Sequence, residues 1–267
     1  MDEIYVNIAD FNILIKIQPQ ETTNNPPYDF IRNRLLTDLV SYLGQFIILE
    51  KPGKVDFEIN FIEAWNLQIL RVKSDNISYI PLYEEISSSK FLTYFLNSIY
   101  QFQLILKYAV HELLDKSSGF LIHSSAVKIN NKAYFFLGKS AAGKSTIATM
   151  LADRYPKIAD DTSLVKKEGN QFFFYQTPFF DKNWVNKHSE RLKMGKMFFL
   201  KKANFFKVEK IEDKEQILNY FLKGYVVNLN KISTKNVLKF VNKFDNFYML
   251  YFAKNPEKTI RLIESLK

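Results

Sequence analysis

Cysteine is absent from all 267 residues, which excludes disulfide bonds, thiolate metal ligands and cysteine nucleophiles. Long apolar runs are also missing: no stretch reaches about 18 uncharged apolar residues, so the sequence predicts no transmembrane helix. The chain begins with the acidic Met1-Asp2-Glu3, whereas a secretory signal begins with a basic segment. We therefore expect a soluble, cytoplasmic protein that does not associate with a membrane.

The excess of basic residues is modest, because 37 lysines and arginines face 28 acidic residues and give a formal net charge of +9. Clustered basic residues would indicate nucleic-acid binding. The lysines are instead spread along the chain. The densest runs, Lys193 to Lys196 and Lys201-Lys202, equally suit the steering of an anionic nucleotide or an acidic peptide. We expect no nucleic-acid partner.

Residues 138–146 read Gly-Lys-Ser-Ala-Ala-Gly-Lys-Ser-Thr, a complete phosphate-binding loop of the form G-x-x-x-x-G-K-[ST]. The apolar run Ala133 to Leu137 before it predicts a buried strand, and the segment Lys144 to Tyr155 after it has apolar residues at helical spacing. A strand, a glycine turn and a helix in this order are the context that the motif requires. That context favours a real phosphate site over a chance match in a lysine-rich chain.

The residue types of the loop suit a bound phosphate chain. Gly138 and Gly143 allow successive backbone N–H groups to face one anion, and the helix N-terminus adds a partial positive charge. Lys144 would reach the β- and γ-phosphates, and Ser145 would hold Mg²⁺ through its hydroxyl. The other residues predicted to contact the nucleotide are Lys139, Ser140, Ala141, Ala142 and Thr146.

Three residues outside the loop are candidates for phosphoryl-transfer chemistry. His123 lies on the strand predicted before the loop, and Asp160-Asp161 follow a short apolar segment where the next strand should end. Two adjacent carboxylates can divide two jobs, holding Mg²⁺ and accepting a proton from an incoming hydroxyl. Each candidate also has a structural interpretation, His123 as a hydrogen-bonded strand residue and Asp160-Asp161 as a turn.

The chain is predicted to hold an N-terminal β-rich α+β module over residues 1–90, a connecting helix over residues 91–118 and the loop-containing core over residues 119–267. Apolar positions at three- or four-residue spacing from Phe91 to Leu113 predict that helix. In the module we expect a hairpin of Ile4 to Ala9 with Phe11 to Ile17, a helix at Asp29 to Leu43, and strands around Phe57 to Phe61, Leu67 to Val72 and Ile77 to Leu82.

In the core, the strand Phe120 to Ile129 is predicted to turn at Asn130-Asn131 into the strand that precedes the loop. Further strands are expected at Gln171 to Gln176 and Met197 to Leu200, and a helix near Lys214 to Leu222.

The order His123-Ser124-Ser125-Ala126-Val127, then the loop, then Ala159-Asp160-Asp161 resembles the catalytic core of HPr kinase/phosphorylase and its relatives. The spacing agrees as well as the residue types. Among these relatives the sequence is most similar to the short kinases that phosphorylate a serine of a lasso-peptide precursor. The specific part of the resemblance covers about residues 119 to 165.

The resemblance implies an α/β fold of the HPr kinase/phosphoenolpyruvate carboxykinase type. It also implies ATP- and Mg²⁺-dependent transfer of the γ-phosphoryl group to a serine hydroxyl of a peptide or protein. It assigns catalytic roles to His123, Lys144 and Asp161, with Asp161 as proton acceptor, and places Ser145 and Asp160 at the metal. The family precedent is compatible with a homo-oligomer.

Two family features lack a counterpart in this sequence. The later Glu-x-Arg-Gly stretch, which carries a Mg²⁺ ligand, is absent, and this puts recognition of HPr and the reverse phosphorolysis reaction in doubt. A catalytic arginine is not assignable either, so Arg191 or a nearby lysine is the candidate substitute. Two other functions stay open: a small-molecule kinase or carboxykinase-like enzyme, and a nucleotide-binding regulator without chemistry.

Overall fold

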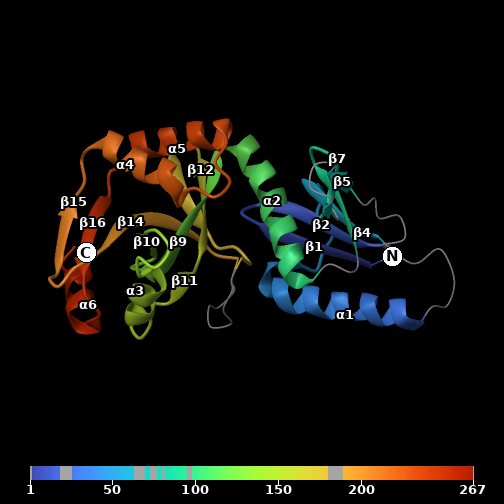
Figure 1. Cartoon of the computed structure of the whole chain (residues 1–267), viewed down its shortest axis with the longest axis horizontal. Coiled ribbons are helices and arrows are strands. Elements are labelled where there is room, and N and C mark those ends of the chain that lie inside the picture. The colour runs from blue at the N-terminus through green and yellow to red at the C-terminus, as the bar shows by residue number, and fades with distance from the viewer. Residues whose placement is uncertain are drawn as a thin grey trace. The chain divides into compact units, whose positions relative to one another are not determined.

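The computed structural model describes residues 2–18, 26–62, 70–72, 77–79, 82–94, 98–179 and 189–266 (Figure 1). The chain divides into two compact units, residues 1–113 and 114–267. Each unit contains a mixed β-sheet with helices, so the fold is mixed α/β, as the sequence predicts at this level. Across the described ranges, no helix combines the length and the apolar character needed to cross a membrane.

The first unit is built on a six-stranded sheet in the order β3-β1-β2-β4-β8-β7. The predicted hairpin is confirmed, since β1 and β2 pair antiparallel through a turn at Ala9 and Asp10, whose φ angles are 54° and 64°. The predicted helix at 29–43 is confirmed as α1. Residues 67–69 and 80–81, which the sequence predicts as strand, lie outside the described residues. The elements are β1 (Asp2–Ile8), β2 (Phe11–Ile17), α1 (Pro26–Leu43), β3 (Ile47–Ile48), β4 (Phe57–Ile62), β5 (Leu70–Val72), β6 (Ile77–Tyr79), β7 (Glu84–Ser87) and β8 (Lys90–Tyr94).

The helix predicted over residues 91–118 begins later than expected, because residues 90–94 form β8 and α2 covers Ile99–Ser117. Phe91 adds to the sheet beside β4, where its ring packs edge-on against Phe57 with centroids 4.7 Å apart. Ser98 starts the helix with a reciprocal cap: its N–H donates to Gln101 Oε1 at 2.7 Å, and its hydroxyl accepts the Gln101 N–H at 3.3 Å. Sheet pairing and this cap together override the helical spacing that starts at Phe91.

The second unit holds an eight-stranded sheet. The predicted turn at Asn130-Asn131 is confirmed, with φ angles of 49° and 57° between the antiparallel β9 and β10. On its other side β10 pairs parallel with β14, which pairs parallel with β16. β12 and β13 link β9 back to β14, so the pairings close into a ring. The elements are β9 (Gly119–Ile129), β10 (Lys132–Leu137), α3 (Lys144–Leu151), β11 (Lys157–Ala159), β12 (Thr162–Glu168), β13 (Gln171–Tyr175), β14 (Arg191–Lys202), β15 (Lys207–Lys210), α4 (Lys214–Tyr220), a π-helical turn η3 (Phe221–Tyr225), α5 (Lys231–Lys243), β16 (Phe247–Phe252) and α6 (Pro256–Glu264).

Helices cover both faces of the parallel strands β10, β14 and β16 (Figure 1). Successive side chains of a strand point to opposite faces. Phe135 and Phe199 accordingly join the core beneath α4 and α5, whereas Phe136 and Phe198 join the core beneath α3 and α6. Because the three strands run parallel, their carboxyl ends meet at one edge of the sheet. The loop 138–143 lies at this edge.

Candidate functional site

The loop has the strand and helix that the motif requires. β10 ends at Leu137 and α3 begins at Lys144, with Gly143 as its N-cap at φ +103°. Residues that carry a side chain rarely adopt this backbone conformation. A Cβ on Gly143 would also lie only 2.8 Å from the ring of Phe252. A Cβ on Gly138 would lie 2.5 Å from the Cβ of Ala142. Packing therefore requires glycine at both positions.

The loop folds around the side chain of Lys144. Its Nζ donates to the carbonyl of Gly138 at 2.9 Å and lies 3.5 Å from the carbonyl of Lys139. The Ala142 N–H closes the turn on the Lys139 carbonyl at 3.0 Å. Gly138, Lys139 and Ala142 thus shape the loop. The other motif residues line a cavity of about 450 Å³: Ser140, Ala141, Gly143, Lys144, Ser145 and Thr146.

Three residues from outside the loop line the same cavity: Asp160, Asp161 and Lys202. The two acids follow β11, which pairs with β9 beside β10. His123 of β9 lies next to them, and its Nδ1 is 3.7 Å from Asp161 Oδ2. The side chain of His123 is 40% exposed and that of Asp161 is 46% exposed. The predicted residues are therefore brought together, although His123 is not among those that line the cavity.

Two buried serines hold the acidic pair in place. The Ser124 N–H donates to the Asp161 carbonyl at 3.1 Å, and the Ser125 hydroxyl donates to the Asp160 carbonyl at 2.7 Å. The Ser124 hydroxyl itself donates to Ser163 Oγ at 2.7 Å. From the sequence, these serines could be interpreted only as part of the family resemblance. The structure shows that they hydrogen-bond to the backbone that carries both carboxylates.

The two carboxylates lie in different surroundings. Asp160 Oδ1 accepts a hydrogen bond from Lys157 Nζ at 2.5 Å, and these side chains are only 4% and 2% exposed. Asp161, by contrast, is 46% exposed. A buried carboxylate needs such a compensating cation. The ion pair therefore gives Asp160 a structural task besides any role at the metal, a task that the sequence did not indicate.

Replacement of Lys157 with Met should destabilise the protein by about 3–5 kcal/mol, because it leaves the buried Asp160 charge unpaired. Urea unfolding measures the loss. The double variant Lys157→Met/Asp160→Leu should recover most of the stability, since it removes both charges. As a control, Arg261→Met breaks an ion pair with Glu257 whose side chains are 76% and 72% exposed, and should change stability by less than about 1 kcal/mol. Equal losses in the two single variants would contradict the burial argument.

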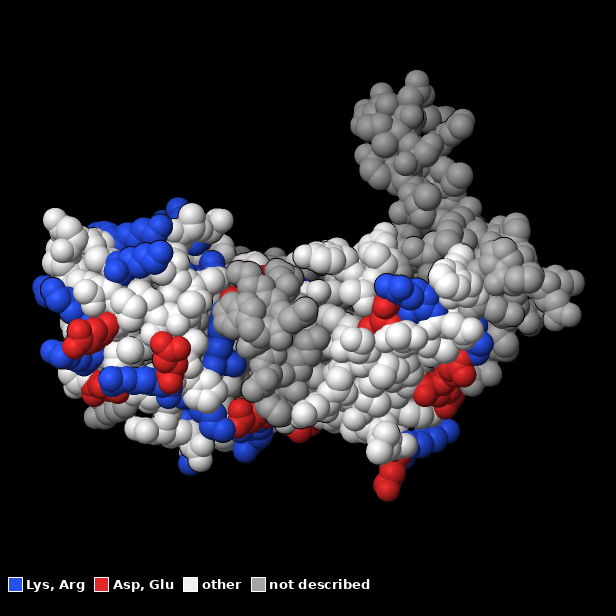
Figure 2. All heavy atoms as spheres, turned by 90° about the horizontal axis from the view of Figure 1, so that it is seen from below, with Lys and Arg blue, Asp and Glu red and all other residues white. Residues whose placement is uncertain are grey.

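From outside the loop, Lys202 is the cation that lines the cavity among the described residues, whereas Arg191, the arginine suggested by the sequence, lies elsewhere. Arg191 begins β14, bonds to Glu168 and covers the ring of Phe173 at 3.6 Å. Lys202 ends the same strand, and its Cε lies 3.8 Å from where a Cβ on Gly143 would be. Only the pairing of β10 with β14 shows this, since the two strands are far apart in the sequence. On the face seen in Figure 2, acidic side chains are interspersed with the basic ones.

The cavity offers the oxygen donors that Mg²⁺ prefers, namely the Ser145 hydroxyl and the Asp160 carboxylate. Within the described ranges, no group of three or more His, Cys, Asp or Glu side chains gathers as a metal cage. Protein-bound Mg²⁺ commonly takes one or two carboxylates and completes its shell with water and substrate phosphates. The donor set therefore fits Mg²⁺ bound together with a nucleotide.

No family model matches the chain, and no curated protein matches it. Among solved structures, the chain is similar to the HPr(Ser) kinase/phosphatase from Coxiella burnetii, with 13% sequence identity and a TM-score of 0.32 over 55% of this chain and 95% of that one.

Proposed function

We propose that this protein is a cytoplasmic kinase that uses ATP and Mg²⁺ to phosphorylate a serine hydroxyl of a peptide or protein. The observation that carries the proposal is a phosphate-binding loop whose lysine faces the same cavity as two carboxylates. The sequence resemblance favours a lasso-peptide precursor as the acceptor and allows a homo-oligomer. A small-molecule kinase and a non-catalytic regulator are the alternatives that the experiments below separate.

The residues of the cavity divide the work of phosphoryl transfer. Lys144 and the loop amides would bind the β- and γ-phosphates, and Lys202 would add positive charge from β14. Ser145 would hold Mg²⁺, with Asp160 contributing through Oδ2, the carboxylate oxygen that does not accept from Lys157 Nζ. When bound, Mg²⁺ neutralises negative charge on the phosphate oxygens.

Asp161 would act as the general base. The acceptor oxygen attacks the γ-phosphorus, the bond from that phosphorus to the bridging oxygen breaks, ADP leaves, and the hydroxyl proton passes to Asp161. His123, whose Nδ1 lies 3.7 Å from Asp161 Oδ2, would orient this carboxylate or contact the phosphate. The exposed position of Asp161 allows a peptide hydroxyl to approach it.

Incubation with γ-labelled ATP and candidate acceptors tests the function. Label on a serine peptide, dependent on Mg²⁺ and abolished by EDTA, is the expected result. Label on a metabolite alone would identify a small-molecule kinase instead. Tight nucleotide binding without any turnover would indicate a regulator. The first acceptor to try is a precursor peptide encoded beside this reading frame, with a phosphate mass shift as the readout.

Gly143→Ala should weaken ATP binding about 5- to 100-fold, because strain of about 1–3 kcal/mol falls on the loop itself. The Cβ would meet Phe252 at 2.8 Å and force the loop to move. Gly169→Ala is the matched control: Gly169 also has a positive φ, +54°, but nothing lies within 4 Å of its Cβ position, and the residue belongs to the β12–β13 turn. Calorimetric titration should show near-normal ATP affinity for the control. Equal loss in both variants would mean that general destabilisation, and not loop shape, sets the affinity.

A further inference from the structure

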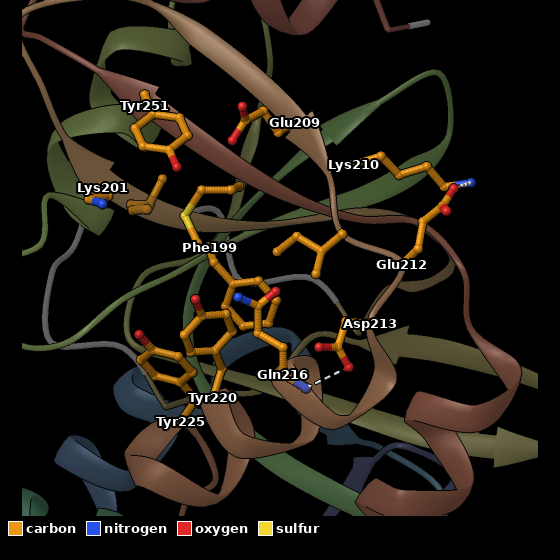
Figure 3. A pocket seen from close by; sticks show the side chains of 13 residues that line it. Phe199, Lys201, Glu209, Lys210, Glu212, Asp213, Gln216, Tyr220, Tyr225 and Tyr251 are labelled. Carbon is orange, nitrogen blue, oxygen red and sulfur yellow. Dashed lines mark hydrogen bonds and ion pairs between the residues drawn. The ribbon is translucent and has the colours of Figure 1, made fainter.

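A second cavity, of about 550 Å³, opens on the α4 side of the sheet. Figure 3 shows Tyr251 and Lys201 on its strand side and Tyr220 and Tyr225 on its helical side. Phe199, which is only 2% exposed, forms part of the floor. Nothing in the proposed phosphoryl transfer uses this cavity.

The second cavity lies one residue pair away from the loop cavity along β14 and β16, on the opposite face of the sheet. In the pairing of β14 with β16, Lys202 lies opposite Phe252 and Lys201 lies opposite Tyr251. Phe252 contacts the loop at Gly143 and Lys202 lines the loop cavity, whereas Lys201 and Tyr251 line the second one. Because consecutive strand residues point to opposite faces, the two cavities meet the sheet from opposite sides near the carboxyl ends of β14 and β16.

The order of the strands gives a bound nucleotide a direction. Strand β10, which leads into the loop, has β9 on one side and β14 on the other. The carboxylates and His123 belong to the β9 and β11 side, so a γ-phosphate that reacts there must point toward β9. The rest of such a nucleotide would then extend the opposite way, over the carboxyl ends of β14 and β16, toward the second cavity on the other face of the sheet.

The lining of the second cavity suits a flat, uncharged, aromatic group with a polar edge. The ring of Tyr251 stacks on Phe205 with centroids 5.4 Å apart, and Lys201 Nζ lies 5.4 Å from the Tyr251 centroid. The Tyr251 hydroxyl is a hydrogen-bond donor at neutral pH, and burial and the neighbouring Glu209 raise its pKa further above the usual value. Aromatic rings of this kind stack on nucleobases.

The polar groups at the rim disfavour a second phosphate. Lys210 pairs with Glu212 at 3.8 Å, Glu209 pairs with Lys207, and Asp213 caps α4. Figure 3 shows the side chain of Gln216 extending from α4 toward Phe199. A carboxamide presents a donor and an acceptor together, the pair that matches the N6 and N7 edge of adenine.

We propose that the second cavity binds the adenine base of the nucleotide whose phosphates occupy the loop, with Tyr251 stacking on the base and Gln216 reading its edge. This inference rests on the proposed kinase function.

Titration calorimetry with ATP and with inorganic tripolyphosphate tests the base site. Tyr251→Leu should weaken ATP binding about 5- to 100-fold, the range expected from the loss of one base-stacking contact, and leave tripolyphosphate binding unchanged. Gln216→Leu should reduce the preference for ATP over GTP about tenfold. Asn219→Leu, an exposed amide on the same helix outside the cavity, is the control and should change neither.

The outcomes separate this inference from the proposed function. If the unaltered protein binds ATP and tripolyphosphate but Tyr251→Leu and Gln216→Leu bind ATP normally, the base site is wrong and the phosphate site stands. Variants that raise only the KM for the acceptor would assign the cavity to the acceptor and also overturn the base site. If Tyr251→Leu weakens the binding of ATP and tripolyphosphate equally, the residue supports the fold and does not contact a base, and the base site is wrong. If the unaltered protein binds neither ligand, the kinase proposal and the base site both fail.

Discussion

Lys144→Ala is expected to weaken ATP binding about 10- to 100-fold, because hydrogen bonds from a charged donor typically contribute about 1.5–3 kcal/mol. Phosphoryl transfer should fall further, since the same cation would neutralise charge that develops on the γ-phosphate. Lys144 Nζ donates to the Gly138 carbonyl at 2.9 Å and Lys144 lines the loop cavity, so its side chain lies within the loop that would bind the phosphates. Calorimetry and labelled-phosphate transfer measure the two losses.

Lys139→Ala is the matched control, since it removes the side chain of the other lysine of the loop and keeps the backbone N–H and carbonyl through which Lys139 is expected to act. Lys139 is exposed, and it contributes its carbonyl to the loop but does not line the cavity. Its replacement should therefore leave ATP affinity close to that of the unaltered protein. If both variants lose affinity equally, the loop attracts anions by net charge alone, and the position of Lys144 carries no special meaning. Unchanged binding in Lys144→Ala would remove the basis of the phosphate site.

The sequence predicts the loop well because all its determinants are local. Its nine motif residues, the buried strand before them and the helical spacing after them are contiguous. The structure confirms this order down to the positive φ of Gly143 at the start of α3. The Asn130-Asn131 hairpin is predictable for the same reason, since asparagine tolerates positive φ and two such residues define the turn.

The other parts of the site depend on pairings between distant segments. Lys202 reaches the loop only because β14 lies next to β10, and Tyr251 lies beside Lys201 only because β16 lies next to β14. No local pattern encodes that strand order. Lys157 and Asp160 are only three residues apart, so a local pattern could have suggested that they form an ion pair. The burial of this pair is not local, because it depends on how β11 pairs with β9.

The late start of α2 shows where local signals compete. The apolar spacing from Phe91 onward favours a helix, yet Phe91 pairs with the sheet through β8. Ser98 and Gln101 are a better indicator of where the helix begins, because a serine followed three residues later by a glutamine can form a capping box. A helix boundary is thus better predicted from capping residues than from apolar periodicity alone.

Asp161→Asn is expected to reduce the rate of phosphoryl transfer about 10²- to 10⁴-fold, the usual contribution of a positioned general base. Asparagine keeps the shape of the side chain but cannot take the proton of the acceptor hydroxyl. ATP affinity should change little, because the loop and Lys144 carry the binding. The expected signature is therefore a lower kcat with a nearly unchanged dissociation constant for ATP, measured by steady-state transfer and calorimetry.

Asp153→Asn controls for the loss of one negative charge in the same segment, since Asp153 is exposed and lies outside the cavity. It should transfer phosphate at the parental rate. Transfer at the parental rate by Asp161→Asn would show that another group takes the proton. Asp160 is poorly suited to that task, because its Oδ1 is held by Lys157 and its side chain is 4% exposed. Of the two carboxylates, only Asp161 is both open to an incoming hydroxyl and next to His123, and for this reason the chemical step is assigned to it.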